Sequence, residues 1–140
     1  MRTKGYATPR NYNLVTVLFT DFKGFSKNSL KMEPLELVNT LDYYFKQFDD
    51  IIEAHYLEKI KTVGDAYMAA GGLPLRNKSN PLNAVLAGLQ IQNFMNDLND
   101  KKILNQEHIW ELRLGVHTGQ VIAGVVWQKQ ICIRCLGANR

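Results

Sequence analysis

The sequence contains few cysteines and no long apolar run. Cys132 and Cys135 are too few for the disulfide framework of a small secreted domain, so a reducing compartment is expected. No apolar stretch approaches the roughly 20 residues of a membrane-spanning helix, and the N-terminus lacks the apolar segment of a secretory signal. We therefore expect a cytoplasmic location, for the chain alone or as the cytoplasmic part of a larger sensor or membrane protein, with no membrane contact from this chain itself.

A strong charge of one sign is also lacking. The formal net charge is +4, and the basic residues are scattered rather than gathered in the runs that bind nucleic acid. Nucleic acid is therefore not an expected partner, whereas a modest positive charge suits a polyanionic ligand such as a nucleotide phosphate. The 140 residues, 46% hydrophobic and 21% charged, have the composition of one globular domain with a real core.

Hydrophobic patterning predicts the element order β-α-β-β-α-β-β. The expected elements are a strand over 13–22, a helix over 32–55, a hairpin of strands 57–63 and 66–72, a helix that Asn80 caps, a polar connection over 100–108, and a hairpin over 109–127 with its turn at Thr118-Gly119.

Two helices on one face of an antiparallel sheet are typical of the ferredoxin-like plan, an α+β fold with a βαββαβ core. Here an additional C-terminal hairpin is expected to follow that core. Residues 1–12 are predicted to form a linker and residues 13–140 a single domain. The fold class alone does not indicate an activity.

Two aspartates are expected at the same edge of this sheet. Asp21 ends the first strand, and Asp65 lies at the turn between the second and third strands. The first strand of this plan is central and lies beside the third, so the two carboxylates could converge and would then need a cation, for which oxygen ligands favour Mg²⁺ or Mn²⁺. Gly24 would let backbone amides approach a phosphate closely. The spacing alone leaves a second interpretation open, in which both are unrelated turn residues.

Three separated motifs resemble the catalytic domain of the class III nucleotide cyclases, the adenylyl and guanylyl cyclases. They are VLFTDFKGFS, LEKIKTVGDAYMAAGGLP and LRLGVHTGQVIAGVV, and they follow the family's order between about Leu14 and Val126. The resemblance implies the class III cyclase fold and a phosphorus–oxygen lyase activity. In that reaction a nucleoside triphosphate becomes its 3′,5′-cyclic monophosphate and pyrophosphate with the help of two Mg²⁺ or Mn²⁺ ions.

The resemblance also implies roles for individual residues. Asp21 and Asp65 match the catalytic, metal-binding aspartates, and Phe22 would add its backbone carbonyl as a metal ligand. The amides of Phe22-Lys23-Gly24-Phe25 would hold the triphosphate.

Lys61 matches the position that selects the base, typically lysine in adenylyl cyclases and glutamate in guanylyl cyclases. It therefore favours ATP, although the pattern alone would have made it a solvated strand residue. His117 and Arg113 are interpreted as structural residues.

The resemblance fails after Val126. The family's active site is shared between two subunits, which implies a homodimer or a heterodimer with another cyclase domain. A segment of the form Y-D-x-W-G-D-x-V-N, continuing to an arginine, normally supplies purine contacts and a transition-state asparagine and arginine. Here Trp127 replaces a glycine, and either Arg134 stands at the aspartate or residues 127–136 form an insertion. Neither alignment supplies the asparagine and arginine.

The favoured hypothesis is thus an adenylyl cyclase domain that is incomplete at its C-terminal end, and whether the chain is active alone stays open at this point. The alternative is a nucleotide-binding or regulatory domain that donates Asp21 and Asp65 to a partner. A diguanylate-type transferase is disfavoured because VGDAY stands where a G-G-[DE]-E-F turn would be. Cys132 and Cys135 lack the second ligand pair of a zinc site. The residues after them show no helical pattern, which a redox C-x-x-C would require, so neither function is favoured for this motif.

Overall fold

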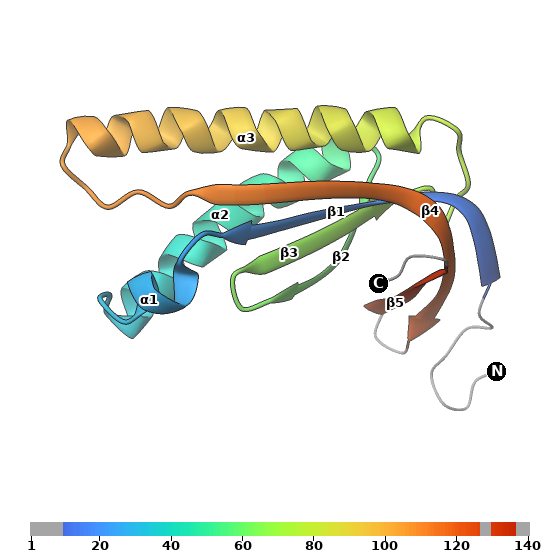
Figure 1. The fold of residues 1–140 in the computed structure, drawn as a ribbon, viewed down its shortest axis with the longest axis horizontal. Helices are drawn as coiled ribbons and strands as arrows, with labels where there is room; N and C mark the ends of the chain where they lie inside the picture. The colour runs from blue at the N-terminus through green and yellow to red at the C-terminus, as the bar shows by residue number, and fades with distance from the viewer. Residues whose placement is uncertain (1–9, 127–129, 137–140) are drawn as a thin grey trace.

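The computed structural model of the chain describes residues 10–126 and 130–136. The elements in chain order are β1 (Arg10–Phe22), α1 (Phe25–Ser29), α2 (Pro34–Ala54), β2 (Glu58–Val63), β3 (Ala66–Gly71), α3 (Asn80–Leu104), β4 (Leu112–Val126) and β5 (Gln130–Leu136) (Figure 1).

The strands form one antiparallel sheet in the order β2-β3-β1-β4-β5, and α2 and α3 lie on one side of it (Figure 1). The expected α+β plan is therefore confirmed, with the first strand in the centre beside the third. In the described part of the chain, no helix is both long enough and apolar enough to cross a membrane.

The prediction of a turn at Thr118-Gly119 is wrong, because β4 runs through it without a break. β1 begins at Arg10, three residues before the expected start and inside the expected linker. This long strand pairs with β4 from Phe22↔Leu112 to Arg10↔Ala123, so the Thr118-Gly119 backbone has a ladder partner and stays extended. The C-terminal hairpin exists, but β4 and β5 form it.

The start and end of α3 also differ from the prediction. The helix continues to Leu104, through half of the expected polar connection, because residues such as Lys101 and Lys102 are good helix formers. Asn80 is not the N-cap, which is Ser79; it is a fully buried helical residue. Its side chain accepts a hydrogen bond from Thr16 Oγ1 at 2.6 Å and donates one to the Leu14 carbonyl at 3.1 Å. Asn80 therefore joins the start of α3 to the central strand.

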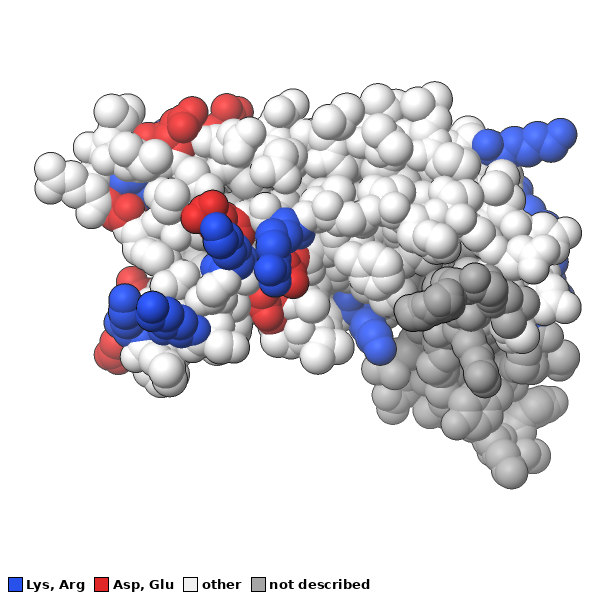
Figure 2. All heavy atoms as spheres, viewed as in Figure 1, with Lys and Arg blue, Asp and Glu red and all other residues white. Residues whose placement is uncertain are grey.

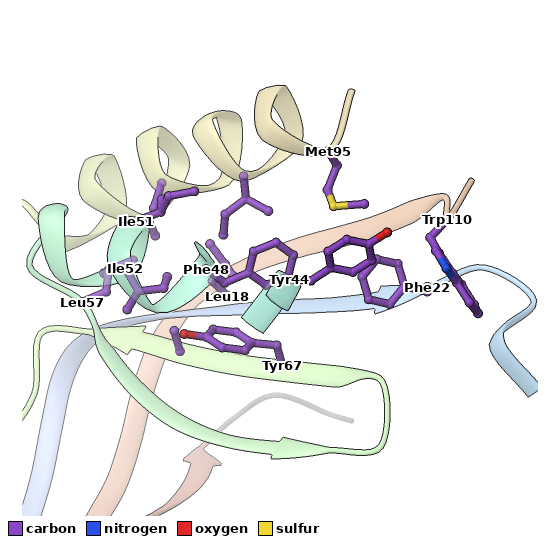
Figure 3. Close-up of a cluster of buried hydrophobic side chains, with 14 residues drawn as sticks. Leu18, Phe22, Tyr44, Phe48, Ile51, Ile52, Leu57, Tyr67, Met95 and Trp110 are labelled. Atoms are coloured by element: carbon purple, nitrogen blue, oxygen red, sulfur yellow. The ribbon is translucent and has the colours of Figure 1, made fainter. Parts of the chain in front are cut away.

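The main core lies between the sheet and the two long helices, and we call this side of the sheet the covered face (Figure 3). Its largest fully buried side chains are aromatic: Tyr44 and Phe48 from α2, Phe22 from β1 and Tyr67 from β3. The Phe48 and Tyr67 rings meet edge to face, with centroids 5.5 Å apart. Such a contact stabilises the packing beyond the area that it buries.

The other side of the sheet, the open face, has a smaller core at one end. It consists of Tyr12, Val15, Val17, Ile60, Ala70, Leu73, Val121 and Ala123. Along the rest of this face apolar side chains remain exposed, with 45% of Phe19 and 63% of Val63 accessible. Because side chains alternate along a strand, Phe19 and Asp21 project to this face while Leu18 and Phe22 enter the main core.

Candidate active site

The central strand ends at the two residues from which the site is built. Phe22 is buried in the covered-face core, and its ring fixes the end of β1 against Tyr44 at a centroid distance of 5.6 Å. Asp21, one residue earlier, projects to the open face. The β2–β3 turn brings Asp65 to the same place, where Asp65 Oδ2 accepts a hydrogen bond from the Phe22 backbone N–H at 2.9 Å. The structure therefore places the Asp65 side chain against the residue next to Asp21.

Arg113 also lies at this site. Its interpretation from the sequence as a structural residue did not place it here. It lies opposite Asp21 in the β1–β4 ladder. Its Nε donates to Asp21 Oδ1 at 2.7 Å and its Nη2 to Oδ2 at 2.8 Å. Hydrogen bonding to Asp21, followed by the charges of Asp21 and Asp65, raises the pKa of Arg113. The signal in the sequence was an arginine between Leu112 and Leu114, whose alternation puts it on the face of Asp21.

A β-bulge decides which face Lys61 occupies. Lys59 pairs with Ala69, but Lys61 pairs with Met68, so Ile60 is an extra residue in β2. A bulge reverses the alternation of the side chains that follow it. Lys59 consequently lies over the Tyr67 ring on the covered face, whereas Lys61 reaches the open face.

A cavity of about 480 Å³ opens on this face, a size within the range of small-ligand sites. Its lining residues are Phe19, Thr20, Asp21, Lys61, Val63, Ala66, Tyr67, Met68, Arg113, Leu114 and Gly115. Apolar and aromatic walls beside charged groups can accept a flat base next to phosphates. Figure 2 shows acidic and basic side chains next to one another on the part of the surface shown, rather than a patch of one sign.

The predicted phosphate loop is partly engaged within the protein. The Phe22 amide bonds to Asp65, and the Lys23 amide donates to the Glu111 carbonyl at 2.8 Å. Gly24 has a φ of 67°, a left-handed conformation that glycine adopts without strain. Of the four predicted amides, those of Gly24 and Phe25 make no backbone hydrogen bond among the loop and turn contacts of the described residues.

The site offers a divalent ion part of its ligands, and a bound triphosphate would add the rest. No group of three or more His, Cys, Asp or Glu side chains occurs in the described part of the chain. Asp21 and Asp65 offer carboxylate oxygens, Phe22 offers its carbonyl, and the bidentate guanidinium shows that the Asp21 carboxylate faces a cation. Mg²⁺ usually binds through one or two carboxylates and substrate phosphates, so the residues fit such an ion when a triphosphate is bound.

The remaining candidate residues lie away from this site. His117 pairs with Val17 along the sheet and is not among the residues that line the cavity. Cys132 and Cys135 lie in β5 and pair with Gly124 and Val121, so their C-x-x-C is part of a strand. Trp127 lies outside the described residues, and the two alignments of the tail stay open.

Comparisons with known proteins agree with this geometry. A family model described as the adenylate and guanylate cyclase catalytic domain matches residues 7–137. Guanylyl cyclase C of Homo sapiens is 38% identical over 127 residues, which are 90% of this chain and 12% of that protein. Among solved structures, the dimeric guanylyl cyclase domain of the RhoGC fusion protein from Blastocladiella emersonii aligns with a TM-score of 0.75 at 23% identity, covering 90% of this chain and 69% of that one. The adenylyl cyclase CyaB from P. aeruginosa aligns with a TM-score of 0.79 at 23% identity, covering 94% and 68%. The chain thus spans about an eighth of the first of these relatives.

Proposed function

Because the chain belongs to the adenylate and guanylate cyclase catalytic domain family, we propose that it is an adenylyl-type domain that forms 3′,5′-cyclic AMP and pyrophosphate from ATP. The observation that carries the choice of ATP is Lys61, which the bulge in β2 places in the open-face cavity. An ammonium group only donates hydrogen bonds. It can therefore serve the N1 acceptor of adenine, whereas guanine carries an N–H donor at that position.

The residues at the end of β1 would position the reacting groups. Asp21 and Asp65 would hold divalent ions, and the Phe22 N–H keeps the Asp65 carboxylate aimed at the site. Two bound ions would supply the lowered pKa of the ribose 3′-hydroxyl and the neutralisation of the phosphates. The 3′-oxygen then bonds to the α-phosphorus, the bond to pyrophosphate breaks, and the 3′-proton passes to solvent. Asp21 and Asp65 are thus proposed as positioning groups for an in-line displacement.

We propose that two copies pair through their open faces, so that Asp21 of one copy works with Lys61 of the other. The exposed apolar side chains of this face, Phe19 and Val63, support the pairing because pairing would take them out of water. A heterodimer with another cyclase domain would bury the same face. The proposed location is cytoplasmic, as part of a longer signalling protein.

A second candidate function is that of a nucleotide-binding domain, because no described residue is assigned to the roles of the transition-state asparagine and arginine. In that case the chain binds metal–ATP and completes the site of a partner. The departure of the tail from the family pattern after Val126 favours this possibility.

The first test is production of cyclic nucleotides by the purified chain with Mn²⁺ and either ATP or GTP. Cyclic AMP from ATP, lost in Asp65→Ala and reduced in Lys61→Glu, supports the proposed activity. Preferential formation of cyclic GMP would overturn the choice of ATP.

If neither product forms, the chain is mixed with a cyclase that lacks its metal aspartates but has a complete tail. Recovered activity that depends on Asp65 supports the second function. Absence of metal–ATP binding would contradict both functions.

A further inference from the structure

The acidic end of the central strand already contains a cation of the protein's own. Arg113 uses two donors on the two oxygens of Asp21, at 2.7 and 2.8 Å, and the charge of Asp65 acts on the same guanidinium. Asp65 in turn is fixed by the Phe22 amide at 2.9 Å. One positive group therefore balances two carboxylates that would otherwise repel each other.

We propose that the Arg113 guanidinium occupies the space that a divalent ion takes at Asp21, so that metal binding and the Arg113–Asp21 pair exclude each other. This inference rests on the proposed function, because it concerns the metal site of that function. It makes Arg113 a positioning residue that holds the Asp21 carboxylate in place before a metal binds and sets the threshold for metal binding.

The physical reason is competition for one carboxylate. An ion bound to an Asp21 oxygen would lie within a few ångströms of a guanidinium held by the same carboxylate, and like charges repel strongly at that distance. The pair is also easy to release, because 63% of the Arg113 side chain and 40% of the Asp21 side chain are exposed. Exposed ion pairs of this kind contribute little to stability, so a metal ion can replace the arginine without disturbing the fold.

The test is Mn²⁺ binding without nucleotide, measured by calorimetry on the whole chain. Arg113→Gln should tighten the dissociation constant about three- to tenfold, and more at low than at high salt. Arg113→Lys keeps the charge but loses the bidentate fork. Its dissociation constant for Mn²⁺ should therefore lie between those of the unaltered chain and Arg113→Gln. Lys61→Gln is the matched control, since it removes one positive charge from the same cavity without touching Asp21, and it should change the constant less than twofold.

A second readout follows the arginine directly. In a chain with ¹⁵N-labelled arginine, saturating Mg²⁺ should shift the Arg113 Nε–H resonance away from its hydrogen-bonded position. That signal is assigned as the one absent in Arg113→Gln. The shift should be absent in Asp65→Ala.

The outcomes separate the two proposals. Equal tightening in Arg113→Gln and Lys61→Gln, or an unchanged Nε–H resonance at saturation, overturns the competition while leaving an Asp65-dependent metal site intact. If neither the unaltered chain nor Arg113→Gln binds Mn²⁺ in an Asp65-dependent way, the metal site of the proposed function fails, and the competition fails with it.

Discussion

On the covered face of the sheet, α2 and α3 bury aromatic side chains, whereas the open face keeps Phe19, Asp21 and Lys61 in contact with solvent. The two sets alternate along the same strands, so Phe22 stabilises the fold while its neighbour Asp21 faces the site. The comparison teaches that fold and chemistry can be altered separately here, although they share a backbone. Substitutions on the covered face should change stability, and those on the open face should change binding.

The largest effect on stability is expected from Phe48→Ala. Phe48 is fully buried, and removing its ring leaves a cavity among the rings that surround it, at a cost of about 3–5 kcal/mol in the free energy of unfolding. Urea denaturation followed by circular dichroism measures this loss. The matched control is Phe19→Ala on the open face. A comparable loss of unfolding free energy in this variant would contradict the distinction between the two faces. Phe19→Ala should instead weaken self-association, measured by sedimentation.

A smaller loss is expected from Asn80→Ala. The change leaves the fully buried Thr16 hydroxyl and the Leu14 carbonyl without their Asn80 partner, which costs about 1–3 kcal/mol in the free energy of unfolding. Hydrogen exchange of the β1 amides near Thr16 should quicken as the start of α3 detaches. Asn83→Ala, on the exposed side of the same turn, serves as the control and should leave both measurements unchanged.

Two tyrosines of the covered face should differ when each becomes phenylalanine. Tyr67 donates a hydrogen bond to Asp49 Oδ1 at 2.6 Å, so Tyr67→Phe should destabilise the protein by about 0.5–1.5 kcal/mol. The buried Tyr44 hydroxyl makes no hydrogen bond to the described residues, so Tyr44→Phe should be neutral or slightly stabilising. Equal losses in both variants would contradict this distinction.

The same tyrosines predict a dependence on alkaline pH. Burial, and then the charge of Tyr43, raises the pKa of Tyr44 to about 12. Burial, followed by the hydrogen bond to Asp49, also raises the pKa of Tyr67. The unfolded chain therefore loses these protons first, so stability should be complete below pH 10 and fall as the pH rises towards 12. Urea midpoints at pH 9 and 11 measure the fall, which should be smaller in Tyr44→Phe.

The smallest effect on stability is expected from Arg113→Gln. Arg113 and Asp21 are an exposed pair on the open face, and such pairs add little to the free energy of unfolding. The thermal midpoint should stay unchanged while the affinity for Mn²⁺ changes. A clear fall in the midpoint would show that the pair supports the fold as well as the site.

Local chemistry made the centre of the site predictable. Asp21 at a strand end and Asp65 after Gly64 are visible in the sequence, and the ferredoxin-like order allows them to converge at one edge of the sheet. The Lys61 assignment came from the resemblance alone, because nothing in LEKIKTV announces the extra residue in β2. Bulges depend on how two strands pair, and one strand alone does not contain that information.

Long-range pairing explains the errors. Thr118-Gly119 has turn residues, yet β1 is long enough to hold β4 extended past it. Asn80 has the chemistry of a cap, yet the nearby Thr16 hydroxyl gives it a buried partner instead. The bidentate hydrogen bonds of Arg113 go to Asp21, the residue opposite to it on β1, which the Arg113 segment does not contain.

The tail departs from the family pattern after Val126, and a shift of the reading frame would explain this departure. Residues 127–137 read WQKQICIRCLG. Codons that specify this string can specify GKNKYAYDVWG in the adjacent reading frame, which supplies the expected glycine and the Y-D-x-W-G pattern of the resembled family. We expect the coding DNA to contain these codons. Codons that forbid the second string would contradict a frame shift.

The open face has one more consequence, for the amount of this protein in a cell. A copy without a partner displays Phe19 and Val63 beside a cavity that also has charged lining residues, and exposed apolar surface is what chaperones and proteases recognise. Quality control would then remove unpaired copies first. The abundance of the partner, rather than the rate of synthesis, would set how much of the chain persists.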